Sequence, residues 1–383
     1  MLQGSSVITY TIDATTGALG QSITQDVGDA HTLTGEPQGR YVFAAFGPRG
    51  GPPYWDPTIV AYASNPVAGS LVTVSKASSD PIWCRFCSPV GRSGEWYWLS
   101  ASATRVYGMW LTGTYHDSYH AYVTHAVENA GQLGPAYVRQ FDEWDYGQVT
   151  VDVDSDVLYK QDSPGLTAHV VEPDGSLRQV GASDVCVDST QGYERPLVAV
   201  GGFLFASGDF RTASGLPDEF VCSWEGPGLA PRAKLALNSE YAEYAVALSS
   251  VDASRASSSP AASRPPTLVA MRTSYSVEHA NYYYTTQYKV RLFAMRDGDL
   301  QPLDTVEVEP RYPRHLLFHP SGRFLYTSHG LSRAAPTGDS PDSLTVYSID
   351  PDGHLAAVQT LVGAGGAMAV TRPPQVRATA PGS

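Results

Sequence analysis

Residues 312–326 read YPRHLLFHPSGRFLY, and this stretch decides the fold class. Two short apolar and aromatic runs, 316–318 and 324–326, lie on either side of the turn His319-Pro320-Ser321-Gly322. Short apolar runs separated by a turn rich in Pro and Gly predict two strands of a β-hairpin. The second run ends in the small polar residues 327–328.

The same pattern recurs along the chain at intervals of about 45–65 residues, which is the spacing of β-propeller blades. A turn followed by an apolar and aromatic second strand occurs at 39–46, 94–100, 156–159, 202–208, 267–272 and 322–328. A further hairpin is predicted near each of 6–24, 57–75, 120–140, 165–180, 219–236, 287–307 and 344–361. Turns such as Pro351-Asp352-Gly353 connect the strands of these hairpins.

We therefore predict an all-β fold, a seven-bladed β-propeller of four-stranded antiparallel blades. One domain is expected over residues 1–372, followed by a loose tail at 373–383. One blade lacks its first hairpin, and residues 367–370 are expected to supply it together with the N-terminus. Such a closure joins the first and last blades and hides the sheet edges. An open ring or a ring of six blades is the alternative.

Composition excludes several classes of partner. The net charge is −13 and only 25 residues are Lys or Arg, which argues against a nucleic-acid surface. No apolar run approaches the length of a membrane-spanning helix. The first residues, MLQGSS, do not resemble a signal peptide, so a cytoplasmic location is expected unless a leader was trimmed. The four cysteines are expected to be buried or half-buried thiols without disulfides.

The longest predicted links follow the second strand of each blade, and long loops gather on the face of a scaffold that binds ligands. Residues at the start of a first strand or the end of a second strand should therefore surround the mouth of the central channel on that face. These residues are His31, Arg85, Tyr146, Arg195, Asp209, Arg272, Arg314, His315 and His329. Ionisable groups that converge on one concavity predict a small-molecule site.

The stretch 312–326 and the blade spacing resemble the lactonase-type seven-bladed propellers, and among them most closely the fungal carboxy-cis,cis-muconate cyclases. The resemblance implies an enzyme that closes an unsaturated carboxylate into a lactone without a cofactor. Arg195 and Arg272 fall where that family has carboxylate-binding arginines, and Asp209 falls where it has a glutamate. The family's histidine would fall near Tyr146, where this chain has none. This departure argues against muconate itself and leaves ring closure of another substrate open.

The resulting assignment is a cofactor-independent cyclase or isomerase, lactonising or pericyclic, that binds an anionic or unsaturated small molecule. Arg195 and Arg272 would hold a carboxylate, while Asp209 or Tyr146 would transfer the proton. Substrate contacts are expected from Trp144, Arg314, His315 and His329. No metal is expected, because few acidic residues fall at the mouth and the arginines would repel a cation. Each of these residues also has a structural interpretation, as a packing, capping or backbone-bonding group.

Two other functions stay open. One is hydrolysis of a lactone, as in sugar-lactonase relatives, which would require an activated water. The other is a non-catalytic interaction platform, which would require an exposed apolar patch rather than a charged mouth.

Overall fold

The structure is a computed structural model, and nearly all of its described residues lie in β-strands or in the turns between them. The described residues are 2–3, 6–28, 30–37, 39–47, 54–55, 58–65, 70–78, 82–83, 95–114, 117–141, 148–162, 165–185, 196–211, 217–236, 243–252, 267–279, 283–308, 312–330, 342–364 and 367–370. The described part of the chain contains one helical turn, η1 (Asn129–Gly131). No helix in these ranges is long and apolar enough to cross a membrane.

Seven antiparallel sheets follow one another along the chain, and we number them sheets 1 to 7. Sheet 1 contains β1 (Leu2–Gln3), β2 (Ser6–Ile12) and β3 (Leu19–Asp26). Sheet 2 contains β4 (Ala30–Gly35), β5 (Tyr41–Phe46), β7 (Thr58–Ser64) and β8 (Leu71–Ser78). Sheet 3 contains β10 (Glu95–Ala101), β11 (Arg105–Thr114), β12 (Asp117–Val127) and β13 (Leu133–Phe141). Sheet 4 contains β14 (Val149–Asp152), β15 (Val157–Asp162), β16 (Gly165–Val171) and β17 (Leu177–Ser183).

The remaining sheets have the same four-stranded order. Sheet 5 contains β18 (Leu197–Val200), β19 (Phe203–Arg211), β20 (Pro217–Glu225) and β21 (Ala230–Ala236). Sheet 6 contains β22 (Glu243–Asp252), β23 (Thr267–His279), β24 (Tyr283–Arg296) and β25 (Asp299–Val308). Sheet 7 contains β26 (Tyr312–Phe318), β27 (Phe324–Gly330), β28 (Ser343–Ile349) and β29 (Leu355–Val362). Two short strands, β6 (Tyr54–Trp55) and β9 (Ile82–Trp83), pair with each other outside these sheets.

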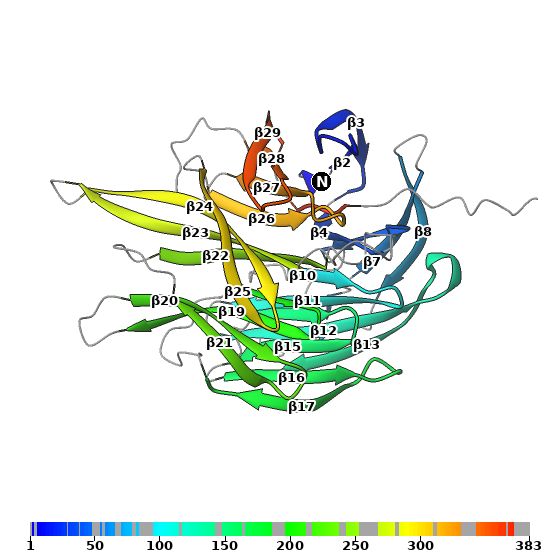
Figure 1. Cartoon of the computed structure of the whole chain (residues 1–383). Coiled ribbons are helices and arrows are strands. Elements are labelled where there is room, and N and C mark those ends of the chain that lie inside the picture. The colour runs from blue at the N-terminus through cyan, green and yellow to red at the C-terminus, as the bar shows by residue number, and fades with distance from the viewer. Residues whose placement is uncertain are drawn as a thin grey trace, which may run out of the picture.

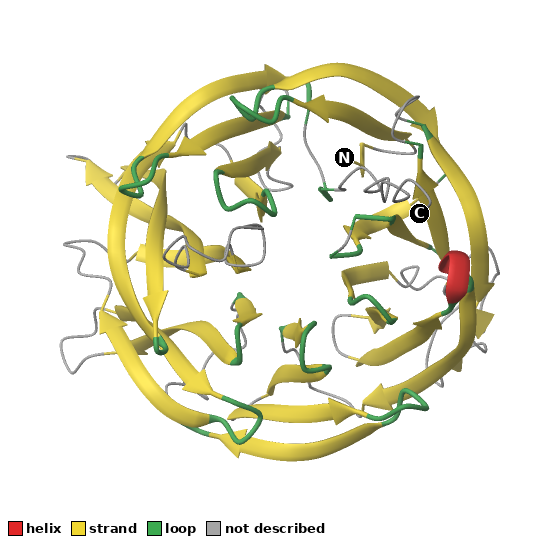
Figure 2. Ribbon diagram, turned by 45° about the vertical axis from the view of Figure 1, so that its right-hand side comes forward, coloured by secondary structure: helices red, strands yellow, loops and turns green. Residues whose placement is uncertain are grey.

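The sheets are arranged in a ring, as Figure 2 shows, and their strands are labelled in Figure 1. The innermost strands contact one another in chain order: β4, β10, β14, β18, β22 and β26. The predicted all-β propeller with four-stranded antiparallel blades is therefore confirmed for sheets 2 to 7. Sheet 1 has three assigned strands.

The core lies between neighbouring sheets, because alternate residues of a strand point to opposite faces. In β27, Leu325 packs with Leu268 and Leu292 of sheet 6. Its neighbours Phe324 and Tyr326 pack on the other face, with Ile12 and Leu19 of sheet 1. Strands that are covered on both faces read as nearly continuous apolar runs, which explains the recurring pattern in the sequence.

Six of the turns before an outer strand contain the sequence Gly-x-Leu, at 17–19, 69–71, 131–133, 175–177, 298–300 and 353–355. The glycine has a positive φ where it ends a tight turn, as at Gly175 and Gly353, both with φ 90°. This conformation is accessible to glycine at little cost. The leucine then begins the outer strand or is its second residue.

These leucines are held by the preceding sheet. In sheet 7, Leu355 N–H donates to Asp304 Oδ2 of sheet 6 at 2.6 Å. In sheet 2, Leu71 and Gln25 of sheet 1 form two hydrogen bonds of 2.9 Å, one in each direction. Side chains on one outer strand thus bind the backbone at the start of the next, and the same device recurs around the ring.

The ring closes between sheets 7 and 1. Leu19 N–H donates to Gln359 Oε1 at 2.7 Å, and Gln359 Nε2 donates to the Leu19 carbonyl at 3.1 Å. Residues 367–370 also return to the beginning of the chain: Ala367 packs in the core of sheet 2, and Val370 packs with Phe324 of sheet 7. A Cβ added at Gly35 would lie 2.9 Å from the Val370 carbonyl oxygen. The expected proximity of this segment to the N-terminal part of the chain is confirmed.

Three sequence predictions are corrected. Residues 95–101 form the first strand of their sheet, β10, rather than a second strand. The long link expected after Arg272 is mostly a hairpin, because β23 continues to His279 and β24 begins at Tyr283. Cys222 of β20 is buried and disulfide-bonded, so the prediction of four thiols without disulfides is wrong. The predicted tail at 373–383 lies outside the described residues.

Candidate functional site

Buried polar residues occur on the second strands of sheets 4 to 7, each beyond the apolar start of the strand. They are Lys160 of β15, Ser207 of β19, Arg272 of β23 and His329 of β27, and none is more than 3% exposed. Burying polar groups in this way is costly unless the surroundings compensate for the lost hydration. Buried polar residues at matching positions of four neighbouring sheets therefore mark the candidate functional region of the ring.

Arg272 is the most deeply buried of the charged residues, with 0% exposure. It alternates with Leu268 and Ala270, which pack against sheet 7, so it lies between sheets 6 and 7. Its guanidinium carbon is 5.2 Å from the centre of the Tyr288 ring, within the range of a cation–π contact. Burial lowers the pKa of Arg272 to about 10, and Tyr347 and Tyr288 act in the opposite direction. The guanidinium is therefore cationic at neutral pH.

His329 lies in the same layer, approached from sheet 7. It alternates with Thr327 and Leu325, and Leu325 is part of the core shared with sheet 6. Its Nε2 is 2.9 Å from Thr327 Oγ1, and the side chains of both residues are buried. We call Arg272, Tyr288, Thr327, His329 and Tyr347 the Arg272 layer. The structure thus brings two of the predicted site residues, Arg272 and His329, to one interface between neighbouring sheets.

The depth of the Arg272 layer differs from the sequence prediction. Arg272 was expected at the rim of the channel, at the end of its strand. Because β23 extends seven residues further, the guanidinium is enclosed between two sheets instead. From this position the guanidinium can attract an anionic ligand through its electrostatic field, without touching the ligand directly.

His315 is exposed on the innermost strand β26, directly opposite Ser328 of β27. The Ser328 hydroxyl is buried, and among the described residues it has no hydrogen-bond partner. Arg314 is in β26 beside His315. Of the two histidines predicted to contact the substrate, His315 is therefore exposed to solvent on an inner strand, whereas His329 is buried.

Asp209 belongs to sheet 5, where its backbone lies opposite Glu219 of β20. Sheet 5 packs on the face of sheet 6 that carries Met271, whereas Arg272 is on the face toward sheet 7. Sheet 6 therefore stands between β19 and the Arg272 layer. Of the remaining predicted residues, His31 is in β4 and stacks on Trp110 of sheet 3, and Arg85, Trp144, Tyr146 and Arg195 lie outside the described residues.

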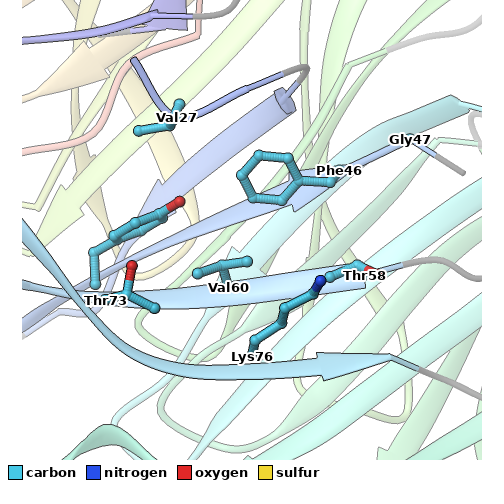
Figure 3. Close-up of a pocket in the computed structure, with 8 residues that line it drawn as sticks. Val27, Phe46, Gly47, Thr58, Val60, Thr73 and Lys76 are labelled. Atoms are coloured by element: carbon cyan, nitrogen blue, oxygen red, sulfur yellow. The ribbon is translucent and has the colours of Figure 1, made fainter. Parts of the chain in front are cut away.

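A separate recess lies between sheets 1 and 2 and has a volume of about 160 Å³. Figure 3 shows its lining, in which the Lys76 side chain extends toward Thr58 beside Val60 and Phe46. The buried residues Phe46, Val60 and Tyr62 form an apolar wall, Thr58, Thr73 and Lys76 form a polar one, and burial raises the pKa of Tyr62. This volume is below the usual range of small-molecule sites. The recess can take an aliphatic or aromatic group but not a whole sugar lactone.

The described residues contain no group of three or more His, Cys, Asp or Glu side chains placed to hold a metal ion. Lys160 and Ser207 are buried polar residues that the sequence analysis did not include among the candidate site residues. Their signal is a polar residue directly after an apolar second strand, as in Val157-Leu158-Tyr159-Lys160 and Phe203-Leu204-Phe205-Ala206-Ser207.

Solved structures with the same architecture include the crystal structure of a "putative 6-phosphogluconolactonase" from Bacteroides fragilis. It is 12% identical over 94% of this chain and 95% of that chain, with a TM-score of 0.54. Raptor from Chaetomium thermophilum is 12% identical over 87% of this chain and 24% of that chain, with a TM-score of 0.48. Sqt1 from Saccharomyces cerevisiae is 10% identical over 91% and 77%, with a TM-score of 0.46. No protein-family model and no curated protein matches the chain. Likeness at this identity establishes a lactonase-like propeller fold alone.

Proposed function

We propose that this chain is a small-molecule enzyme of the lactonase-like propeller type, which closes a ring on an unsaturated carboxylate. In this proposal residues 367–370 form the inner strand of sheet 1 and complete a seventh blade. The observation that carries the proposal is the cationic guanidinium of Arg272, which is fully buried between sheets 6 and 7 and lies 5.2 Å from the centre of the Tyr288 ring.

The Arg272 layer supports an anionic substrate for an electrostatic reason. A guanidinium surrounded by protein acts on a nearby carboxylate through a low dielectric, so the attraction is stronger than it would be in water. Because the pKa of Arg272 is about 10, the positive charge persists throughout the neutral range. An anion at the channel face above sheets 6 and 7 would be oriented by this charge, with His329 on the face of sheet 7 that is turned toward Arg272.

The proposed reaction is an intramolecular addition. A carboxylate oxygen of the substrate forms a C–O bond with one alkene carbon, the π bond breaks, and a proton is delivered to the other carbon. Arg195 and Arg272 would orient the carboxylate, and Tyr146 would deliver the proton, because sheet 6 separates Asp209 from the Arg272 layer. Trp144 and Arg314 would contact the rest of the substrate. The product is an isomer of the substrate, so no external reactant is consumed.

Hydrolysis of a lactone is the second candidate, and the likeness to the Bacteroides fragilis structure favours it. In that reaction water adds to the acyl carbon, the ring C–O bond breaks, and the alcohol oxygen takes a proton. The same positive field would stabilise the oxyanion that forms at the acyl carbon.

Isotopes separate the two reactions. The full-length chain would be incubated with a panel of unsaturated carboxylates and a panel of lactones, in H₂¹⁸O and separately in D₂O. Hydrolysis adds one ¹⁸O to the product, whereas ring closure adds none and places one deuterium on carbon. Turnover of neither panel, together with no binding of either class, would overturn the proposed function and favour the interaction platform.

Arg272 provides the residue-level test. Arg272→Gln is expected to lower kcat/KM about 10- to 100-fold, the size of a lost charge-assisted interaction, and Arg272→Lys should recover part of it. Arg323→Gln is the matched control, because Arg323 lies in the turn between β26 and β27, is exposed and stacks on Phe324 at 5.5 Å. Melting curves must show that both variants are folded. Equal activity of Arg272→Gln and the control would remove Arg272 from the mechanism.

A further inference from the structure

Three neighbouring outer strands of the propeller carry almost no charge. They are β29, β3 and β8, each eight residues long. Among all their residues only Asp26 and Lys76 are charged. The outer strands β13 and β17 carry one charged residue each, β21 carries two, and β25 carries Asp299, Asp304 and Glu307. We call β29, β3 and β8 together the neutral rim.

The three strands of the neutral rim are joined side by side. The Gln359 side chain binds both backbone groups of Leu19 and so connects β29 to β3. The Gln25 side chain binds both backbone groups of Leu71 and so connects β3 to β8. The rim is therefore one continuous surface, on the side of the ring where β29 and β3 lie (Figure 1).

Exposed aliphatic side chains are concentrated on this surface. Across the described residues five large hydrophobic side chains are exposed, and four of them lie on the neutral rim. The four are Val362 at 66%, Val72 at 56%, Val358 at 40% and Ile23 at 36%. Outer strands also present an unpaired edge, which natural proteins usually protect with charged residues. The neutral rim lacks that protection.

We propose that the neutral rim is the surface through which two copies of this chain associate. Each copy carries a net charge of −13, so most encounters between copies place like charges together and are unfavourable. A contact through the neutral rim avoids this repulsion and removes exposed valine and isoleucine side chains from water.

The two charges on the rim fit a twofold arrangement. In a dimer with twofold symmetry both copies use the same surface. A residue of the first copy that contacts a second residue of its partner is therefore matched by the same contact with the two copies exchanged. Asp26 and Lys76 have opposite signs, and the described residues include no ion-pair partner for Lys76. Lys76 of each copy can therefore pair with Asp26 of the other.

The test is the mass of the full-length chain in solution, measured by light scattering and by sedimentation over a concentration series. The expected result is an equilibrium between the 41.0-kDa chain and a species of twice that mass. Added salt should strengthen association, because it screens the repulsion between two copies of net charge −13 more than it weakens the two pairs formed by Asp26 and Lys76. A single 41.0-kDa species at every concentration and salt level would overturn the proposal.

Two matched double variants locate the contact. Val358→Lys with Val362→Lys places charge on the neutral rim and should shift the wild-type equilibrium to monomer. Gln301→Lys with Thr305→Lys places the same charge on exposed positions of β25 and should leave the dimer intact. Melting curves confirm that both are folded. A dimer that persists in the rim variant, or dissociates equally in both, would show that another surface is used. These readouts do not involve catalysis, so they are independent of the proposed function.

Discussion

The Gln359 side chain binds the backbone N–H and the carbonyl of Leu19, a residue 340 positions earlier in the chain. This pair of hydrogen bonds joins the last outer strand of the ring to the first. A primary amide has one donor and one acceptor side, so it can satisfy both backbone groups of one residue at a strand edge.

Gln359→Ala should therefore weaken ring closure. Two hydrogen bonds at a partly buried position are expected to contribute about 1–3 kcal/mol to the free energy of unfolding. Urea denaturation would measure the loss. Gln301→Ala on β25 is the control, because Gln301 is exposed and has no side-chain hydrogen bond in the described part of the structure. Equal stability of the two variants would mean that the amide of Gln359 is dispensable.

Two buried tyrosines should respond in opposite ways to loss of the hydroxyl. Tyr107 of sheet 3 donates a hydrogen bond to Asp156 of sheet 4, and burial raises its pKa. Tyr107→Phe leaves that carboxylate without its donor and should cost about 1–3 kcal/mol of unfolding free energy. The hydroxyl of Tyr326 has no partner among the described residues, so Tyr326→Phe should be neutral or stabilising. Parallel denaturation of the two variants checks the contrast, which would be refuted if both lost stability equally.

Acid should destabilise the fold through His125. This residue is fully buried in β12, and its Nδ1 lies 2.9 Å from the Gly134 carbonyl oxygen. Burial lowers its pKa, and the bond to Gly134 only partly opposes this. The unfolded chain therefore binds more protons as the pH falls below about 6.5, and stability decreases by at most about 1.4 kcal/mol per pH unit.

His125→Asn keeps a donor for the Gly134 carbonyl but cannot titrate. Its unfolding free energy should fall less steeply between pH 7 and pH 5 than that of the wild type. His354→Gln, at a position whose side chain is 66% exposed, is the control and should keep the wild-type slope. An unchanged slope in His125→Asn would exclude this residue as the source.

The disulfide of Cys222 should contribute to stability. Cys222 is 1% exposed in the core shared by sheets 4 and 5, and the other three cysteines all precede sheet 5 in the chain. The bond therefore closes a long loop, and its reduction should cost about 2–4 kcal/mol. Thermal melting with and without a reductant measures this, and Cys222→Ala should melt like the reduced chain.

Local patterns were enough to predict the blades. The turn at His319–Gly322 and the strands around it occur where the sequence places them, because apolar alternation and turn chemistry act over a few residues. The return of residues 367–370 to the beginning of the chain was likewise predictable from an incomplete set of hairpins. Burial of Arg272 was not, because the end of β23 depends on pairing with β24 over a hairpin that reads as a polar loop. The role of Gln359 was not predictable either, since a single glutamine on an exposed strand carries no pattern.

The position of residues 367–370 also determines when the fold can be completed during synthesis. Their partner Gly35 is translated long before them, and the ring cannot close until residues 367–370 have followed. Until then the flanks of sheets 1 and 7 that meet in the finished ring are uncovered, and a nascent chain in this state is prone to aggregation. Chaperones that bind apolar surfaces should therefore raise the yield of folded protein. The increase should be smaller for a chain truncated before residue 367, because that chain cannot close the ring.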